Sequence, residues 1–226
     1  MQFTSFDTRD ALYLALADAV SASIEAAVSA GRRASLVVPG GSSPAPVYRA
    51  LAVRSLPWSD VDVTLTDERW VAPDDAASNQ RMISETLLTE QAAAARFVPL
   101  MGEEASPEAG LMQAANRLSG LARPFDVVLL GMGLDGHTAS LFPDMPTIDD
   151  GLADGAPVCL AARPESQPVA RISLSAEVLG DARAVWLLVT GEDKLAVLEA
   201  GARADLPPPV VSVLSRHPEP VVWWAP

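Results

Sequence analysis

The segment Phe125–Pro143, FDVVLLGMGLDGHTASLFP, decides the fold. Its apolar start, Phe125–Leu130, is typical of a strand that is buried on both faces of a sheet. The next residues, Gly131–Gly136, match the G-x-G-x-x-G pattern of dinucleotide-binding loops, but that pattern requires a full helix directly after it. Pro143 leaves room for roughly one or two helical turns. We therefore expect a glycine-rich turn with a different purpose.

One of the two histidines of the chain, His137, directly follows this turn. Glycines allow a close approach of backbone to ligand, and ligands of open α/β sheets bind at the carboxyl ends of the strands. An imidazole can also transfer protons near neutral pH. We therefore favour a catalytic role for His137, with Gly133 and Gly136 at the binding site, over a histidine that merely caps the following short segment.

Outward from this turn, apolar runs alternate with helical segments. Strands are predicted at residues 34–38, 61–65, 125–130 and 184–190, with further candidates at 157–162 and 170–175, and helices at about 8–30, 46–52, from Ser78, from Ser106 and at 191–202. The apolar runs PVVSVL and PVVWW close the chain, and residues 143–157 are rich in Asp, Gly and Pro and predict a loop. Alternating strands and helices predict a single α/β domain over residues 1–226, with a mostly parallel sheet covered on both faces and a mixed edge after residue 155.

Composition narrows the classes of partner. The net charge is −13 and no block of five basic residues occurs, which disfavours nucleic acids and anionic membranes. The single cysteine, Cys159, fits a reducing cytoplasm. The first residues, MQFTSFDTRD, contain neither a basic n-region nor an apolar h-region, so we expect no signal peptide. No uninterrupted apolar run reaches the ~18–20 residues that a membrane span needs.

Two further loops follow predicted strands at the same sheet edge. GGSSP, from Gly40 to Pro44, opens a helix with small residues, free N–H groups and hydroxyls, which suits a phosphate. The alternative is an ordinary strand–helix turn; as a phosphate site, the loop would bind through Gly40, Gly41, Ser42 and Ser43. It is not a Walker loop, because no G-K-[ST] follows.

The second loop begins with TDERW, Thr66–Trp70, in a polar stretch. Facing a cavity, Asp67 and Glu68 could orient a histidine or a water, and Arg69 could stabilise an oxyanion. Downstream, Asn79 could add an amide to the same lining.

Because the chain is acidic, an anionic ligand needs local cations. The candidates are Arg171 and Lys194; a lysine in the first turn of a helix opposes the helix dipole, which indicates a purpose beyond helix stability. Two histidines and one cysteine cannot build a His-rich or Cys-rich zinc site. Carboxylate-only Mg²⁺ binding stays open but no motif supports it, and we expect neither metal nor cofactor. No G-x-S-x-G nucleophile elbow is present.

In order and spacing, three loops of this chain resemble those of the 6-phosphogluconolactonases: PGGSSP, TDERWV with the later SN, and GMGLDGHTASLFP. These enzymes belong to a wider group that includes glucosamine-6-phosphate deaminases. RISLS and GEDK are similar to later segments of that family, and the resemblance covers about residues 5–220. One conservative departure is the second serine of GGSSP, where threonine is common in the family.

The resemblance implies a three-layer Rossmann-like fold without a bound nucleotide, and hydrolysis of 6-phospho-D-glucono-1,5-lactone, a small sugar-phosphate lactone. It also implies His137 as the base, with Ser42, Ser43, Arg171 and Lys194 at the phosphate. Either Asp67 or Asp135 could orient the imidazole. We expect a monomer or a weak homodimer.

Two alternatives remain at this stage. The first is a sugar-phosphate deaminase of the same group. In those enzymes IAFNEP follows DGH, whereas this chain has TASLFP at that place and lacks the Asn-Glu pair. A non-catalytic sugar-phosphate sensor on the same scaffold would be expected to lose His137 or the charged loop, and both are present.

Overall fold

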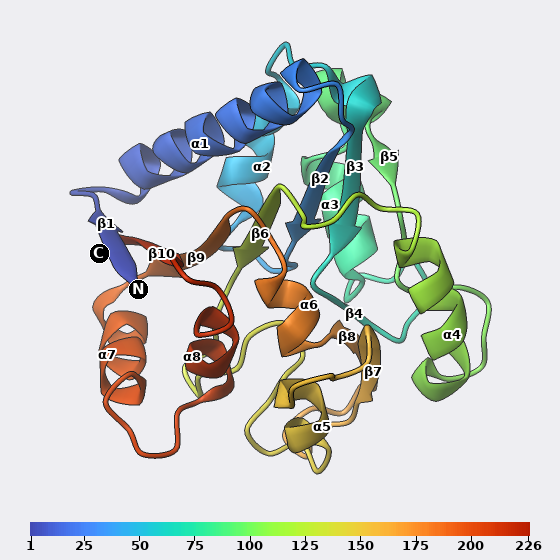
Figure 1. Ribbon diagram of the computed structural model, residues 1–226, viewed down its shortest axis with the longest axis vertical. Coiled ribbons are helices and arrows are strands. Elements are labelled where there is room, and N and C mark those ends of the chain that lie inside the picture. The colour runs from blue at the N-terminus through green and yellow to red at the C-terminus, as the bar shows by residue number, and fades with distance from the viewer.

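The centre of the molecule is a seven-stranded parallel sheet (Figure 1). The computed structural model describes residues 1–226. The strand order is β1-β10-β9-β6-β2-β3-β5, and every pairing is parallel. These strands are β1 (Gln2–Ser5), β2 (Ala34–Val38), β3 (Val61–Leu65), β5 (Arg96–Phe97), β6 (Val127–Leu130), β9 (Val185–Thr190) and β10 (Val221–Ala225).

Helices cover both faces of this sheet. On one side α1 packs against α2, and on the other α8 packs against α6 and α7 (Figure 1). The α-helices are α1 (Arg9–Ser29), α2 (Ala45–Ala52), α3 (Asn79–Thr86), α4 (Pro107–Leu118), α5 (Ile148–Leu152), α6 (Ala176–Gly180), α7 (Glu192–Gly201) and α8 (Pro209–Leu214), and two short 3₁₀ helices cover Trp58–Asp60 and Glu90–Ala94. The predicted three-layer α/β architecture is confirmed.

The antiparallel strands form a small sheet of their own beside the central one. Its order is β4 (Asp67–Arg69), β8 (Arg171–Leu174) and β7 (Cys159–Ala162). The sequence suggested a polar loop after β3, and the structure corrects this, because the charged residues of TDER form β4 and pair with β8. Charged side chains are tolerated in this strand because Asp67 and Glu68 are buried with hydrogen-bond partners.

Local signals explain where several helices begin. The side chains of Thr8, Ser78 and Ser106 accept hydrogen bonds from the first turns of α1, α3 and α4, as Ser and Thr caps do. No helix follows the glycine turn until α5, which interrupts the predicted 143–157 loop. PVVSVL is helical, as α8, whereas PVVWW supplies β10.

The longest helix, α1, is apolar enough and long enough to cross a membrane. It passes that test as a core helix does, because Leu12, Leu16 and Ile24 are fully buried in the hydrophobic core that it shares with the sheet. Its apolar character therefore has a structural explanation within the domain.

Candidate active site

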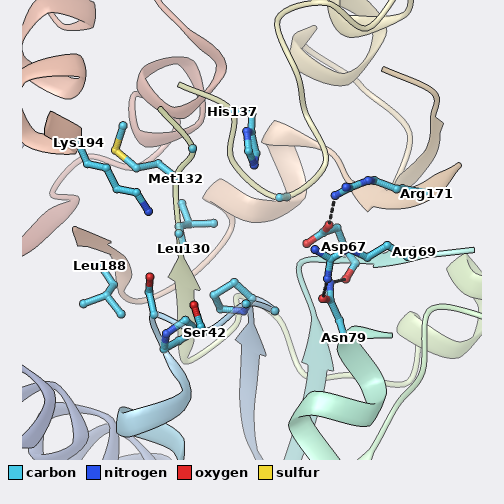
Figure 2. Close-up of a pocket in the computed structure, with 18 residues that line it drawn as sticks. Ser42, Asp67, Arg69, Asn79, Leu130, Met132, His137, Arg171, Leu188 and Lys194 are labelled. Atoms are coloured by element: carbon cyan, nitrogen blue, oxygen red, sulfur yellow. Dashed lines mark hydrogen bonds and ion pairs between the residues drawn. The ribbon is translucent and has the colours of Figure 1, made fainter. Parts of the chain in front are cut away.

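A cavity of about 330 Å³ lies where β2, β3, β6 and β9 end (Figure 2). It is lined by Pro39, Gly40, Gly41, Ser42, Ser43, Pro44, Asp67, Arg69, Asn79, Leu130, Gly131, Met132, Gly133, His137, Ala139, Arg171, Leu188 and Lys194. All the predicted site residues except Glu68, Asp135 and Gly136 contribute to this lining.

The glycine-serine loop between β2 and α2 forms the floor of the cavity in Figure 2. No side chain caps the first turn of α2, so the backbone N–H groups at its start are available to a ligand. A side chain at Gly40 would displace the amide of Asn79, because its Cβ would lie 1.8 Å from Oδ1 of Asn79. The missing side chain of Gly40 lets the amide of Asn79 reach the cavity.

His137 is held by its neighbour Asp135. Nδ1 of His137 lies 2.6 Å from Oδ1 of Asp135, which also accepts a hydrogen bond from the His137 backbone N–H. The imidazole stacks on Phe142 with 4.0 Å between ring centroids. With Nδ1 held in this way, Nε2 is the nitrogen that can exchange a proton with a ligand.

Gly133 makes this position of the imidazole possible. A Cβ there would lie 2.3 Å from Cε1 and Nδ1 of His137. Gly136, by contrast, does not line the cavity. It has a φ of +79°, and a Cβ on it would lie 2.5 Å from Pro208, so it shapes the turn rather than contacting a ligand.

Asp67 does not contact the imidazole, although it lines the cavity. Its carboxylate instead accepts hydrogen bonds from Oγ of Ser140 at 2.5 Å and from Oγ1 of Thr66 at 2.9 Å. Of the two carboxylates considered for orienting His137, only Asp135 makes that contact.

Glu68 is buried outside the cavity, which corrects the expectation that it touches a ligand. Its Oε1 accepts hydrogen bonds of 2.7 Å from the backbone N–H groups of both Arg69 and Asn79, and Oε2 accepts one from Gln80 and one from Ser78. Burial raises the pKa of the Glu68 carboxyl, although the three backbone hydrogen bonds act in the other direction. Glu68 therefore positions Arg69 and Asn79, whose side chains also contact each other in the cavity wall.

Arg171 is the most buried cation of the site. Arg171 lies opposite Arg69 in the β4–β8 ladder, and burial lowers the pKa of its guanidinium. Its Nη2 donates to Gln167, its guanidinium carbon lies 5.0 Å from the centre of the Phe142 ring, and its Nε is buried with no hydrogen-bond partner. The nearest carboxylate oxygen, on Asp67, is 3.9 Å away.

Lys194 supplies a cation on the opposite side of the cavity from Arg171 (Figure 2). It lies in the first turn of α7, and burial lowers the pKa of its ammonium group. The cavity thus gathers positive charge at two separate places in a protein with a net charge of −13.

Sequence reasoning missed the apolar part of the lining. The additional lining residues are Pro39, Pro44, Leu130, Gly131, Met132, Ala139 and Leu188. Several of them flank the recognised motifs, which was an available signal, whereas Leu188 lies in β9 and its sequence neighbours give no such hint.

Metal ligands are scarce in this structure. No group of three or more His, Cys, Asp or Glu side chains lies close enough together to hold a metal ion. Cys159 is buried in β7, outside the cavity, and burial raises the pKa of its thiol to about 11.

The fold and the cavity together define an α/β protein with a cation-lined cavity beside a histidine–aspartate pair, at the carboxyl edge of its parallel sheet. The chain belongs to the glucosamine-6-phosphate isomerase/6-phosphogluconolactonase family, whose model matches residues 7–223. This confirms the resemblance noted from the three loops.

Several similar proteins are named 6-phosphogluconolactonase. A 6-phosphogluconolactonase of Rhizobium meliloti is 40% identical over 98% of this chain and 97% of its own length, and one of Caulobacter vibrioides is 37% identical over 99% and 97%. The crystal structure of a 6-phosphogluconolactonase from Shewanella baltica superposes with a TM-score of 0.95 at 42% identity, covering 100% of this chain and 98% of that one. A monomeric glucosamine-6-phosphate deaminase, at 16% identity and a TM-score of 0.83, shares the fold.

Proposed function

We propose that this enzyme hydrolyses 6-phospho-D-glucono-1,5-lactone to 6-phosphogluconate, the second step of the oxidative pentose phosphate pathway. The full-length similarity to 6-phosphogluconolactonases supports this reaction. The observation that carries it in the molecule itself is the 2.6 Å contact between Asp135 and His137 beside a cavity with cations on two sides.

In the proposed reaction, His137 acts first as a base. Nε2 takes a proton from a water molecule, whose oxygen attacks the lactone carbonyl carbon. Asp135 supports this step, because a carboxylate at Nδ1 fixes the tautomer and stabilises the imidazolium that forms. The tetrahedral intermediate then collapses, the bond to the ring oxygen breaks, and the imidazolium returns its proton to that oxygen.

The oxyanion of the intermediate needs hydrogen-bond donors. We assign this role to Arg69 and to backbone N–H groups of the glycine turn around Gly133, since each well-placed donor contributes about 3–4 kcal/mol. Arg69 is suited to it because Asn79 and Glu68 fix its side chain and its backbone.

The phosphate is the second anchor of the substrate. We assign it to Ser42 and Ser43 at the start of α2, together with Arg171 and Lys194. A complex with 6-phosphogluconate tests this assignment, because a phosphate that lies away from these four side chains would refute it.

The proposed reaction needs no metal and no cofactor, since histidine supplies the proton transfers and the cations supply the electrostatic stabilisation. We further propose a cytoplasmic monomer or weak homodimer that acts on a free small molecule, with no nucleic-acid or membrane partner.

The decisive variant is His137→Ala. We expect the enzymatic rate of lactone hydrolysis, after subtraction of the spontaneous rate, to fall by about 10²–10⁴-fold, the usual contribution of a general acid–base group. Binding of 6-phosphogluconate, measured by calorimetry, should persist because the phosphate ligands are unchanged. Activity near that of the wild type would refute His137 as the base.

A further inference from the structure

Lys194 is the only lysine in a chain of 226 residues; the other fifteen basic residues, apart from the histidines, are arginines. The only other primary amine that the sequence provides is the α-amino group of Met1, which precedes β1 and does not line the cavity. An amine is the only ordinary side-chain group that condenses reversibly with an aldehyde to form an imine. The cavity therefore holds a unique nucleophile of this kind.

The surroundings of Lys194 leave its amine available. Burial is the only cause that shifts the pKa of Lys194, and no carboxylate or hydrogen bond contributes to that shift. The adjoining wall contains Leu130, Met132 and Leu188, whose side chains offer no oxygen or nitrogen acceptor to the amine. Figure 2 shows the amine pointing into the space above Ser42.

Lys194 is one of the four side chains that we assign to the substrate phosphate, but the cavity contains enough other phosphate-binding groups to hold the phosphate of an aldehyde while Lys194 reacts with its carbonyl. Arg171 and Arg69 lie opposite each other in neighbouring strands on the far side, and the free N–H groups before α2 lie on the floor. Arg171 also has a buried Nε with no partner. A small molecule whose phosphate occupies these groups would have the rest of its structure directed into a cavity with one amine.

We propose that Lys194 is a covalent modification site that binds small phosphorylated aldehydes. The aldehyde forms an imine with the Lys194 amine and then occupies the cavity. This inference rests on the proposed phosphate-binding function of the cavity for the recognition of the aldehyde. It adds a second class of ligand, an electrophile that the protein does not hydrolyse.

The neutral amine of Lys194 attacks the aldehyde carbon, the carbonyl oxygen takes up a proton to give a carbinolamine, and loss of one water leaves a C=N bond. A lowered pKa makes a larger share of the lysine neutral at a given pH than for an exposed lysine, which favours attack. The reaction is reversible, so a competing phosphate ligand should drive it back.

The probe is pyridoxal phosphate, followed by borohydride to convert the imine to a stable amine. We expect incorporation of one equivalent by intact mass, mapped to the peptide that contains Lys194, with loss of lactone hydrolysis in proportion. Saturating 6-phosphogluconate should protect. Pyridoxal without its phosphate should label Lys194 at least about ten-fold more slowly, since charge-assisted hydrogen bonds to the phosphate are lost.

Lys194→Arg is the matched control, because it keeps a cation but has no amine. Its labelling should be confined to the amino terminus. Modification of wild-type protein only at Met1, or equal rates with pyridoxal and pyridoxal phosphate, would overturn the proposal. If 6-phosphogluconate binds and the lactone is hydrolysed while Lys194 stays unmodified, this inference fails alone; absence of both binding and hydrolysis would instead refute the proposed function.

Discussion

The two ends of the central sheet use charge in opposite ways. At the amino ends of the strands, the buried carboxylate of Asp62 receives hydrogen bonds from Arg33 and Arg96, all between 2.7 and 3.3 Å. Asp126 at the same end is paired with Arg32 and bonded to the backbone of Ser35.

At the carboxyl ends the cations are left largely unpaired. Lys194 has no charged partner that shifts its pKa, and the carboxylate nearest to Arg171 is 3.9 Å away. One end therefore satisfies its charges within the protein and gains stability from them. We propose that the other end keeps its charges for a ligand. The same kind of substitution should thus affect folding at one end and function at the other.

Asp135→Asn should give the largest effect, at the carboxyl end. An amide can present its N–H to Nδ1 and favour the wrong imidazole tautomer, so we expect kcat for the lactone to fall by roughly 10²-fold. The free energy of unfolding should change by less than about 0.5 kcal/mol, because Asp135 is 46% exposed. Steady-state kinetics and urea denaturation measure the two quantities. An unchanged kcat would remove Asp135 from the mechanism.

The equivalent substitution at the amino end, Asp62→Asn, should lower the free energy of unfolding by about 2 kcal/mol, because charge-assisted hydrogen bonds from two arginines are weakened. The kcat should not change. Asp60→Asn is the control: Asp60 is half exposed and 3.6 Å from Arg33, and exposed pairs contribute at most about 1 kcal/mol. Equal losses in the two variants would contradict the distinction between the two ends.

Arg171→Met tests the cost of keeping a buried cation for a ligand. We expect binding of 6-phosphogluconate to weaken by about ten-fold, or 1.4 kcal/mol. Burial of the guanidinium has a desolvation cost, which also lowers its pKa, so its replacement by an apolar side chain should not destabilise the fold. Calorimetry and thermal unfolding without ligand provide the measurements. A clear loss of stability would show that Arg171 supports the fold instead.

The smallest expected effect is a pH dependence at the amino end. Burial acts to raise the pKa of Asp62, but hydrogen bonds and charges from Arg33 and Arg96 outweigh it and the pKa is lowered. A lowered pKa in the folded state stabilises the protein above the unfolded-state value of about 3.9, and this stabilisation is lost as the pH falls toward the folded-state pKa.

The difference in unfolding free energy between wild type and Asp62→Asn should accordingly be constant above about pH 5 and shrink on further acidification. Urea titrations at a series of pH values measure it. A difference that grows on acidification would contradict the sign.

The sequence predicted the layers, and it predicted which loops meet at the cavity, because both follow from local patterns. Apolar runs such as Ala34–Val38 and Val61–Leu65 and the caps at Thr8, Ser78 and Ser106 predicted elements that the structure contains. The glycine turn was distinguished from a dinucleotide-binding loop because no full helix follows it.

The failures share a physical cause, which is that burial depends on partners far along the chain. TDER is polar in isolation, yet it becomes β4 because β8, about 100 residues later, supplies the pairing strand. Glu68 was expected in the cavity, but three backbone N–H groups hold it behind the wall. The sequence also could not choose between Asp67 and Asp135 for the imidazole contact, because that depends on turn geometry.

The pairing of Arg69 with Arg171 constrains how relatives of this chain can diverge. Both guanidiniums face the cavity because β4 and β8 are in one fixed register. Gain or loss of one residue within either strand would turn its arginine to the other face of the small sheet. Insertions and deletions should therefore be tolerated in the connection after β7 (Arg163–Ala170) and be eliminated by selection inside β8. Among relatives, the length of this loop should vary while the length of the neighbouring strand stays constant.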